Sequence, residues 1–209
     1  HFRGFAAHWE IPATEPSAIN GRWAPGPGKE LFQALHDSFP GLPIIAEDLG
    51  LITPDVEELR DDFKLPGMRI VQFAFGEGAS HSYLPHNYEV NTVAYTGTHD
   101  NDTLIGWWNT ASPRERAFAR HYLGTDGNSI QWSLMRALSI SVARLVVFPM
   151  QDVLGLDGRG RMNVPGVPEG NWEWRFAWPE VQPWHAKVLR EMGAVHGRCP
   201  FDGVSLHGD

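Results

Sequence analysis

Short apolar runs alternate with segments of helical periodicity along this 209-residue chain. The runs predict four strands, at residues 42–50, 67–75, 92–98 and 143–154. Nearly continuous apolar character is typical of strands that are covered on both faces. The strands are therefore expected in the interior of the fold.

Helix signals lie between and after these runs. Thr53 suits an N-cap and Pro54 suits the first helical position. Ser112 and Glu115 form a capping box around Pro113. The periodicity predicts helices over 53–63, 112–123, 131–143 and 182–195, and we expect no regular structure in the last ten residues.

Strands separated by helices predict βα units and a parallel sheet. A nucleotide-binding sheet would usually carry a glycine-rich phosphate loop, and neither common loop motif is present. A (β/α)8 barrel instead gathers its chemistry at the carboxyl ends of its strands. The acidic residues at or just past predicted strand ends are Glu47, Asp48, Glu77, Asp100 and Asp102.

The amino-acid composition excludes some classes of binding partner. The net charge of −8 argues against nucleic acid, which requires a basic face. No apolar run is long enough to span a membrane, so no membrane partner is expected. The single cysteine, Cys199, excludes an internal disulfide framework and favours the cytoplasm. The nine tryptophans are compatible with a carbohydrate ligand, because sugars stack on aromatic faces.

The stretch I-I-A-E-D-L-G contains two adjacent acidic residues, Glu47 and Asp48. Successive strand residues point to opposite faces, so both cannot face one site. One of them is a candidate acid/base carboxyl. The alternative is that both are solvated, or that Asp48 begins a turn at Gly50.

The stretch T-H-D-N-D-T has three interpretations. Asp102 or Thr103 caps the following helix, or His99, Asp100 and Asp102 bind a metal, or Asp100 belongs to a carboxylate site. Metal binding is disfavoured because the usual pairs of spaced histidine ligands are missing. We therefore expect no metal and no other cofactor. Carboxylates from two strands at one barrel rim are what glycoside chemistry uses.

Five motifs together carry a family resemblance: H-F-R-G-F-A-A-H-W-E-I-P, the stretch from I-I-A-E-D-L-G to V-Q-F-A-F, L-P-H-N-Y, Y-T-G-T-H-D-N-D-T and R-M-N-V-P-G-V-P-E-G-N-W-E-W-R. They resemble glycoside hydrolase family 77, the 4-α-glucanotransferases or amylomaltases. The resemblance implies an α/β fold, the C-terminal half of a (β/α)8 barrel of the α-amylase type. It also implies a retaining enzyme that transfers segments of α-1,4-glucans or maltooligosaccharides to a sugar 4-hydroxyl.

The resemblance also assigns roles to individual residues. Glu47 matches the general acid/base. Asp100 matches the aspartate that stabilises the transition state. His99, Phe73 and Asn163 match substrate-binding positions.

One departure from the family pattern concerns the nucleophile. In the family an aspartate directly precedes H-F-R-G, which here forms residues 1–4. We therefore expect residues 1–209 to be the C-terminal part of one catalytic domain, inactive alone. The rival interpretation is a non-catalytic α-glucan-binding module that uses the aromatic residues and needs neither Glu47 nor Asp100.

Overall fold

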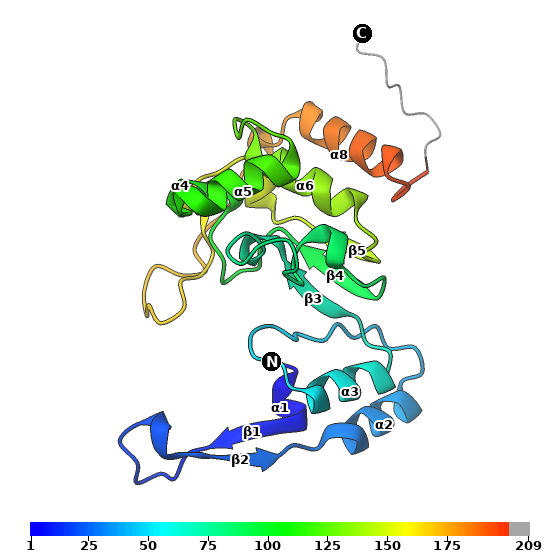
Figure 1. The fold of residues 1–209 in the computed structure, drawn as a ribbon, viewed down its shortest axis with the longest axis vertical. Coiled ribbons are helices and arrows are strands. Elements are labelled where there is room, and N and C mark those ends of the chain that lie inside the picture. Colours follow the sequence, from blue (N-terminus) through cyan, green and yellow to red (C-terminus); the bar gives the residue numbers. More distant parts are fainter. Residues whose placement is uncertain (201–209) are drawn as a thin grey trace. The chain divides into compact units, whose positions relative to one another are not determined.

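The structure is a computed structural model that describes residues 1–200 (Figure 1). The expectation for the last ten residues falls almost wholly outside that range. The chain forms two compact units, which are treated separately. The first comprises His1–Arg69 and Asn91–Val93, and the second comprises Ile70–Val90 and the chain from Ala94 on.

The first unit combines a β-hairpin with helices. Its hairpin strands and helices are β1 (Ala7–Glu10), β2 (Arg22–Pro25), α1 (Arg3–Ala6), α2 (Gly28–Ser38) and α3 (Pro54–Asp62). The hairpin is antiparallel, with Trp9 opposite Trp23. Its core consists of Phe2, Phe32, Ala46, Val56 and Leu59. The prediction of α3 is confirmed, whereas the hairpin and α2 were not predicted.

Residues 42–50 form no regular strand, so that prediction is wrong. The Ala46 N–H donates to the Pro66 carbonyl at 2.8 Å, and the Asp48 N–H donates to the Ala46 carbonyl at 3.0 Å. Pro66 has no N–H to return a bond. Hydrophobicity alone could not show that this extended run lacks a ladder partner among the described residues.

Three strands form one sheet in the order β3-β4-β5. Their bounds are β3 (Gly67–Ile70), β4 (Thr92–Tyr95) and β5 (Leu145–Val147). All three fall inside predicted runs, but each is shorter than its run. The run after Ile70 continues as a 3-10 turn, and a short helix begins at Met150.

Five of the eight α-helices that the structure describes belong to the second unit. They are α4 (Leu104–Thr110), α5 (Pro113–Leu123), α6 (Ile130–Ile140), α7 (Met150–Val153) and α8 (Pro183–Val195). Figure 1 shows α4, α5, α6 and α8 gathered on one side of β4 and β5. Among the described residues, no helix combines the length and apolar character that a membrane span requires.

Local sequence signals account for the helix starts. The Ser112 hydroxyl accepts from the Glu115 N–H, and the Glu115 carboxylate accepts from the Ser112 N–H, which confirms the capping box. Thr103 caps α4, because its hydroxyl accepts from the Gly106 N–H at 3.0 Å. The cap in T-H-D-N-D-T is therefore Thr103 and not Asp102.

Candidate active site

Glu47 and Asp48 lie in opposite environments. The Glu47 side chain is 49 % exposed, whereas the Asp48 side chain is 1 % exposed. The prediction that the two side chains cannot both face one site is confirmed, and the alternative that both are solvated is wrong. Only Glu47 is available to a ligand.

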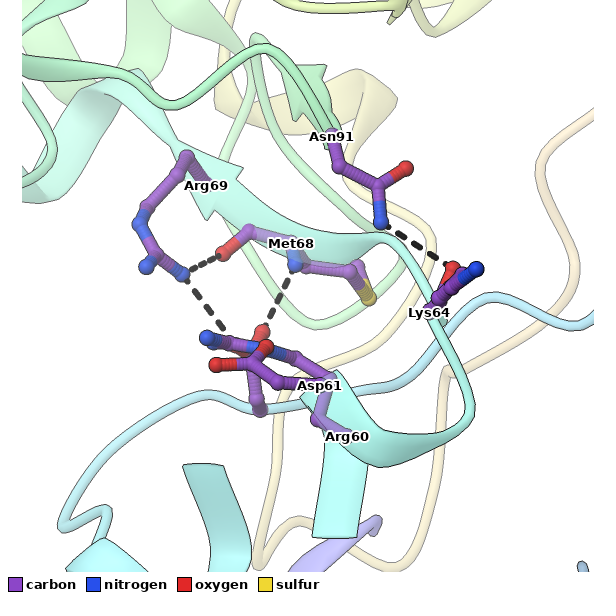
Figure 2. Close-up of polar contacts among 7 residues, drawn as sticks. Arg60, Asp61, Lys64, Met68, Arg69 and Asn91 are labelled. Atoms are coloured by element: carbon purple, nitrogen blue, oxygen red, sulfur yellow. Dashed lines mark hydrogen bonds and ion pairs between the residues drawn. The ribbon is translucent and has the colours of Figure 1, made fainter. Parts of the chain in front are cut away.

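Asp48 is held by three donors from α3 and β3. Its carboxylate accepts from Arg60 Nη1 at 2.7 Å, from the Met68 N–H at 2.6 Å and from Arg69 Nη1 at 3.4 Å. Figure 2 shows the side chains of Arg60 and Arg69 near the Met68 backbone. A β-carbon at Gly67 would collide with the Asp48 carboxylate, so the close fit requires glycine there. This buried ion pair fixes the backbone on which Glu47 lies.

The start of the chain holds the other side of the same segment. The Phe2 N–H donates to the Glu47 carbonyl at 2.9 Å, and the His1 ring contacts the Leu49 carbonyl at 2.7 Å. Arg3 donates to the Leu51 carbonyl. The backbone nitrogen of His1 lies 3.6 Å from Glu47 Oε2. Residues 1–3 are therefore hydrogen-bonded along residues 47–51.

Asp100 lies in the second unit, in the turn between β4 and α4. Its side chain is 46 % exposed. Asn163 Nδ2 donates to Asp100 Oδ1 at 2.5 Å, and Arg161 Nη2 donates to the Asp100 carbonyl at 2.6 Å. Arg161 Nε also donates to the Asn163 carbonyl at 2.8 Å. One carboxylate oxygen is thus fixed by a neutral amide while the carboxylate stays open to solvent.

His99 is fixed by the same distant segment. Its carbonyl accepts from the Asn163 N–H at 3.0 Å. Its ring lies 5.1 Å from the Trp172 ring, tilted by 36°. The Trp172 N–H donates to the Met162 carbonyl at 2.8 Å, and the Trp172 backbone has a φ of 65°. The tryptophan ring therefore covers one face of His99.

The structure brings three of the five predicted site residues together. His99, Asp100 and Asn163 are in mutual contact, although Asn163 lies 63 residues after Asp100. Phe73 is half exposed in the same unit, and its ring lies 6.0 Å from that of Tyr83. Glu47 belongs to the first unit.

Sequence reasoning missed three polar residues that hold the Asp100 turn. They are Gln72, Asp152 and Arg161. Gln72 and Asp152 interrupt apolar runs, and each is buried. A polar residue inside such a run is a usable signal, because burial without a hydrogen-bond partner is costly.

Asp152 is a buried acid with two donors. Its carboxylate accepts from the Thr96 hydroxyl at 2.6 Å and from the Leu104 N–H at 2.7 Å. Burial raises its pKa from 3.8 to about 6, against the two hydrogen bonds, and the charge of Asp102 raises it further. The folded protein therefore binds this proton more tightly than the unfolded chain does.

This shift predicts a pH-dependent stability difference between Asp152 and an asparagine. The raised pKa means that stability is lost as pH rises from about 4 to about 6. The loss is about 3 kcal/mol at 1.36 kcal/mol per pKa unit. We expect Asp152→Asn, in a full-length protein that carries this segment, to gain stability relative to the parent by this amount between pH 4 and pH 7. Urea unfolding of both proteins across this range measures it, and a pH-independent difference would contradict the shift.

No group of three histidine, cysteine, aspartate or glutamate side chains within residues 1–200 is arranged to hold a metal ion. His99, Asp100 and Asp102, the candidate metal ligands, do not form such a group. The Asp100 carboxylate instead accepts from the Asn163 side-chain amide and lies 3.4 Å from His99 Nε2. The geometry therefore favours the carboxylate interpretation of this turn.

Comparisons with known proteins agree with the motifs. Residues 1–181 match the family described as 4-alpha-glucanotransferase. The chain is 52 % identical to the 4-alpha-glucanotransferase of Thermus thermophilus, over 95 % of this chain and 41 % of the relative. It is 48 % identical to the 4-alpha-glucanotransferase of Synechocystis, over 95 % of this chain and 40 % of the relative.

A solved structure gives the same result. The amylomaltase from Streptococcus agalactiae in complex with acarbose matches with a TM-score of 0.90 and 36 % identity, over 95 % of this chain and 40 % of that protein. The chain thus spans about two fifths of the length of these relatives. The resemblance inferred from the motifs is confirmed, and the chain belongs to the 4-alpha-glucanotransferase family, glycoside hydrolase family 77.

Proposed function

We propose that this chain is the C-terminal part of the catalytic domain of a 4-α-glucanotransferase. The enzyme transfers segments of α-1,4-glucans or maltooligosaccharides to the 4-hydroxyl of an acceptor sugar. The proposed domain is a (β/α)8 barrel of the α-amylase type, of which residues 1–209 form the second half. Adjacent β4 and β5 with α4, α5 and α6 between them in sequence support βα units of this kind.

The observation that carries the proposal is the position of Glu47. Its carboxylate lies 3.6 Å from the His1 nitrogen, the atom to which any preceding residue would be joined. In the family pattern that residue is the nucleophilic aspartate. A retaining glycosidase holds its nucleophile and acid/base about 5–5.5 Å apart. The hydrogen bond from the Phe2 N–H to the Glu47 carbonyl holds the start of this segment beside Glu47, which supports such a pair.

Each proposed residue then has a defined step. Protonated Glu47 gives its proton to the leaving sugar oxygen as the upstream aspartate attacks the anomeric carbon and forms a glycosyl ester. Ionised Glu47 then takes the proton of an acceptor 4-hydroxyl, whose oxygen displaces the aspartate. Asp100 remains ionised and opposes the positive charge that develops on the sugar ring in both steps.

The remaining site residues orient the sugar around Asp100. Asn163 occupies Asp100 Oδ1, which leaves Oδ2 to face the substrate. His99 offers a ring nitrogen to a sugar hydroxyl, and Trp172 holds that ring in place. The half-exposed ring of Phe73 provides an apolar surface on which a sugar can stack.

Disproportionation of maltotriose by a full-length protein that carries this segment tests the proposal. We expect glucose together with oligosaccharides longer than maltotriose, because transfer conserves the number of glycosidic bonds. Glucose and maltose without longer products would indicate hydrolysis. Binding of maltotriose without any turnover would favour the glucan-binding module.

The proposed chemistry uses carboxylates alone, so we expect activity to be independent of divalent metal ions. Dialysis against EDTA should leave the rate of glucose release from maltotriose unchanged. Untreated protein carried through the same dialysis without EDTA is the control. A loss of activity that one divalent ion restores would contradict this prediction.

A further inference from the structure

Gln72 joins the two ends of the turn that carries Asp100. Its side-chain amide donates to the Thr96 carbonyl and to the Asp102 carbonyl, at 2.9 Å each. Both partners are carbonyl oxygens, so the NH2 group must face them. Gln72 is buried in the short 3-10 turn after β3. A single side chain from the segment that follows β3 thus closes the turn at its base.

Asp152 joins the same two ends from a different element. Its carboxylate accepts from the Thr96 hydroxyl and from the N–H of Leu104. Leu104 is the first residue of α4. Asp152 lies in α7, just after β5, and is 2 % exposed. The turn is therefore held at its base from both neighbouring strand ends.

The base of the turn has no spare room. A β-carbon at Gly97 would lie 2.7 Å from the Gln72 amide nitrogen and 3.3 Å from the Asn101 β-carbon. The tip of the turn is held separately by Arg161 and Asn163. Base and tip are thus fixed by independent sets of contacts.

Such rigidity has a consequence for charge stabilisation. A fixed negative charge lowers the barrier only if it already lies where positive charge develops. A displacement of about 1 Å can cost on the order of 10²-fold in rate. We propose that Gln72 and Asp152 are positioning residues that hold Asp100 at its working position, an inference that rests on the proposed function of Asp100.

Near-isosteric variants separate positioning from simple stability. Gln72→Met removes both donors, and Asp152→Leu removes both acceptors, without a large change of volume. Asp152→Asn retains an oxygen for the Leu104 N–H and an amide group for the Thr96 hydroxyl oxygen. Gln151→Met is the matched control, because Gln151 is buried in the same helix but donates to the Gly160 carbonyl instead.

We expect Gln72→Met and Asp152→Leu to lower kcat about 10- to 100-fold with KM for maltotriose changed less than about threefold. Affinity for the cationic sugar analogue 1-deoxynojirimycin should fall in parallel with kcat. Asp152→Asn and Gln151→Met should keep kcat within about threefold of the parent. The proposal is overturned if Gln72→Met and Asp152→Leu retain kcat, or if Gln151→Met lowers it equally.

Hydrogen exchange of peptides covering residues 97–103 provides a readout that does not need activity. Gln72→Met and Asp152→Leu should speed exchange in this turn, whereas Gln151→Met should not. If the parent protein transfers no glucan, the proposed function fails. Hydrogen exchange still tests whether Gln72 and Asp152 hold the turn. Unchanged exchange in both Gln72→Met and Asp152→Leu would by itself overturn the inference.

Discussion

Replacing Glu47 by Gln, or Asp100 by Asn, in a full-length protein that carries this segment is expected to reduce transglycosylation by about 10²–10⁴-fold. Glu47→Gln keeps the shape of the side chain but removes the transferable proton. Asp100→Asn keeps an oxygen for the Asn163 amide but removes the negative charge. Glucose release from maltotriose measures both losses.

The matched control is Asp157→Asn. Asp157 is a carboxylate of the second unit whose partner is the exposed Arg159. It should leave the rate unchanged. Circular dichroism of all three variants checks folding. Near-parental turnover by Glu47→Gln or Asp100→Asn would remove the role assigned to that residue.

The second large effect concerns stability. Arg60→Met leaves the Asp48 carboxylate buried without its shortest side-chain partner, since Arg69 lies farther away at 3.4 Å. Breaking a buried pair in this way costs about 3–5 kcal/mol. We expect the midpoint of urea unfolding to fall accordingly, with glucan transfer also reduced because Glu47 adjoins Asp48.

A double variant tests the cause of that loss. Asp48→Asn combined with Arg60→Met removes the buried charge and keeps an acceptor for the Met68 N–H. It should be more stable than Arg60→Met alone. Arg159→Met, which breaks a surface pair, should cause no measurable loss. A double variant less stable than Arg60→Met would show that the unpaired charge is not the cause.

Local signals predicted the helices better than the strands. The capping box at Ser112 and the proline at the start of α3 act through neighbouring backbone groups, so they can be recognised in the sequence. A strand also needs a partner. The apolar run 42–50 lies beside Pro66, which has no N–H to donate, and no strand ladder forms there.

The site shows the same limit at longer range. The T-H-D-N motif identified Asp100, but its contact with Asn163 joins residues that only the fold brings together. That Asn163 belongs to the site came from family resemblance, not from spacing. The bonds of Gln72 to Thr96 and Asp102 left no trace in the sequence except a polar residue in an apolar run.

Trp172 shows what selection on this segment would reveal. A φ of 65° is unfavourable for a side chain with a β-carbon and costs on the order of 1 kcal/mol, which glycine would avoid. A library of residues at position 172 that is sorted for thermal resistance should therefore enrich glycine and asparagine. The same library sorted for growth on maltodextrin should retain the aromatic ring that covers His99. The two sorted populations would diverge at this one position, and the divergence would measure how much stability the enzyme forgoes to keep that ring.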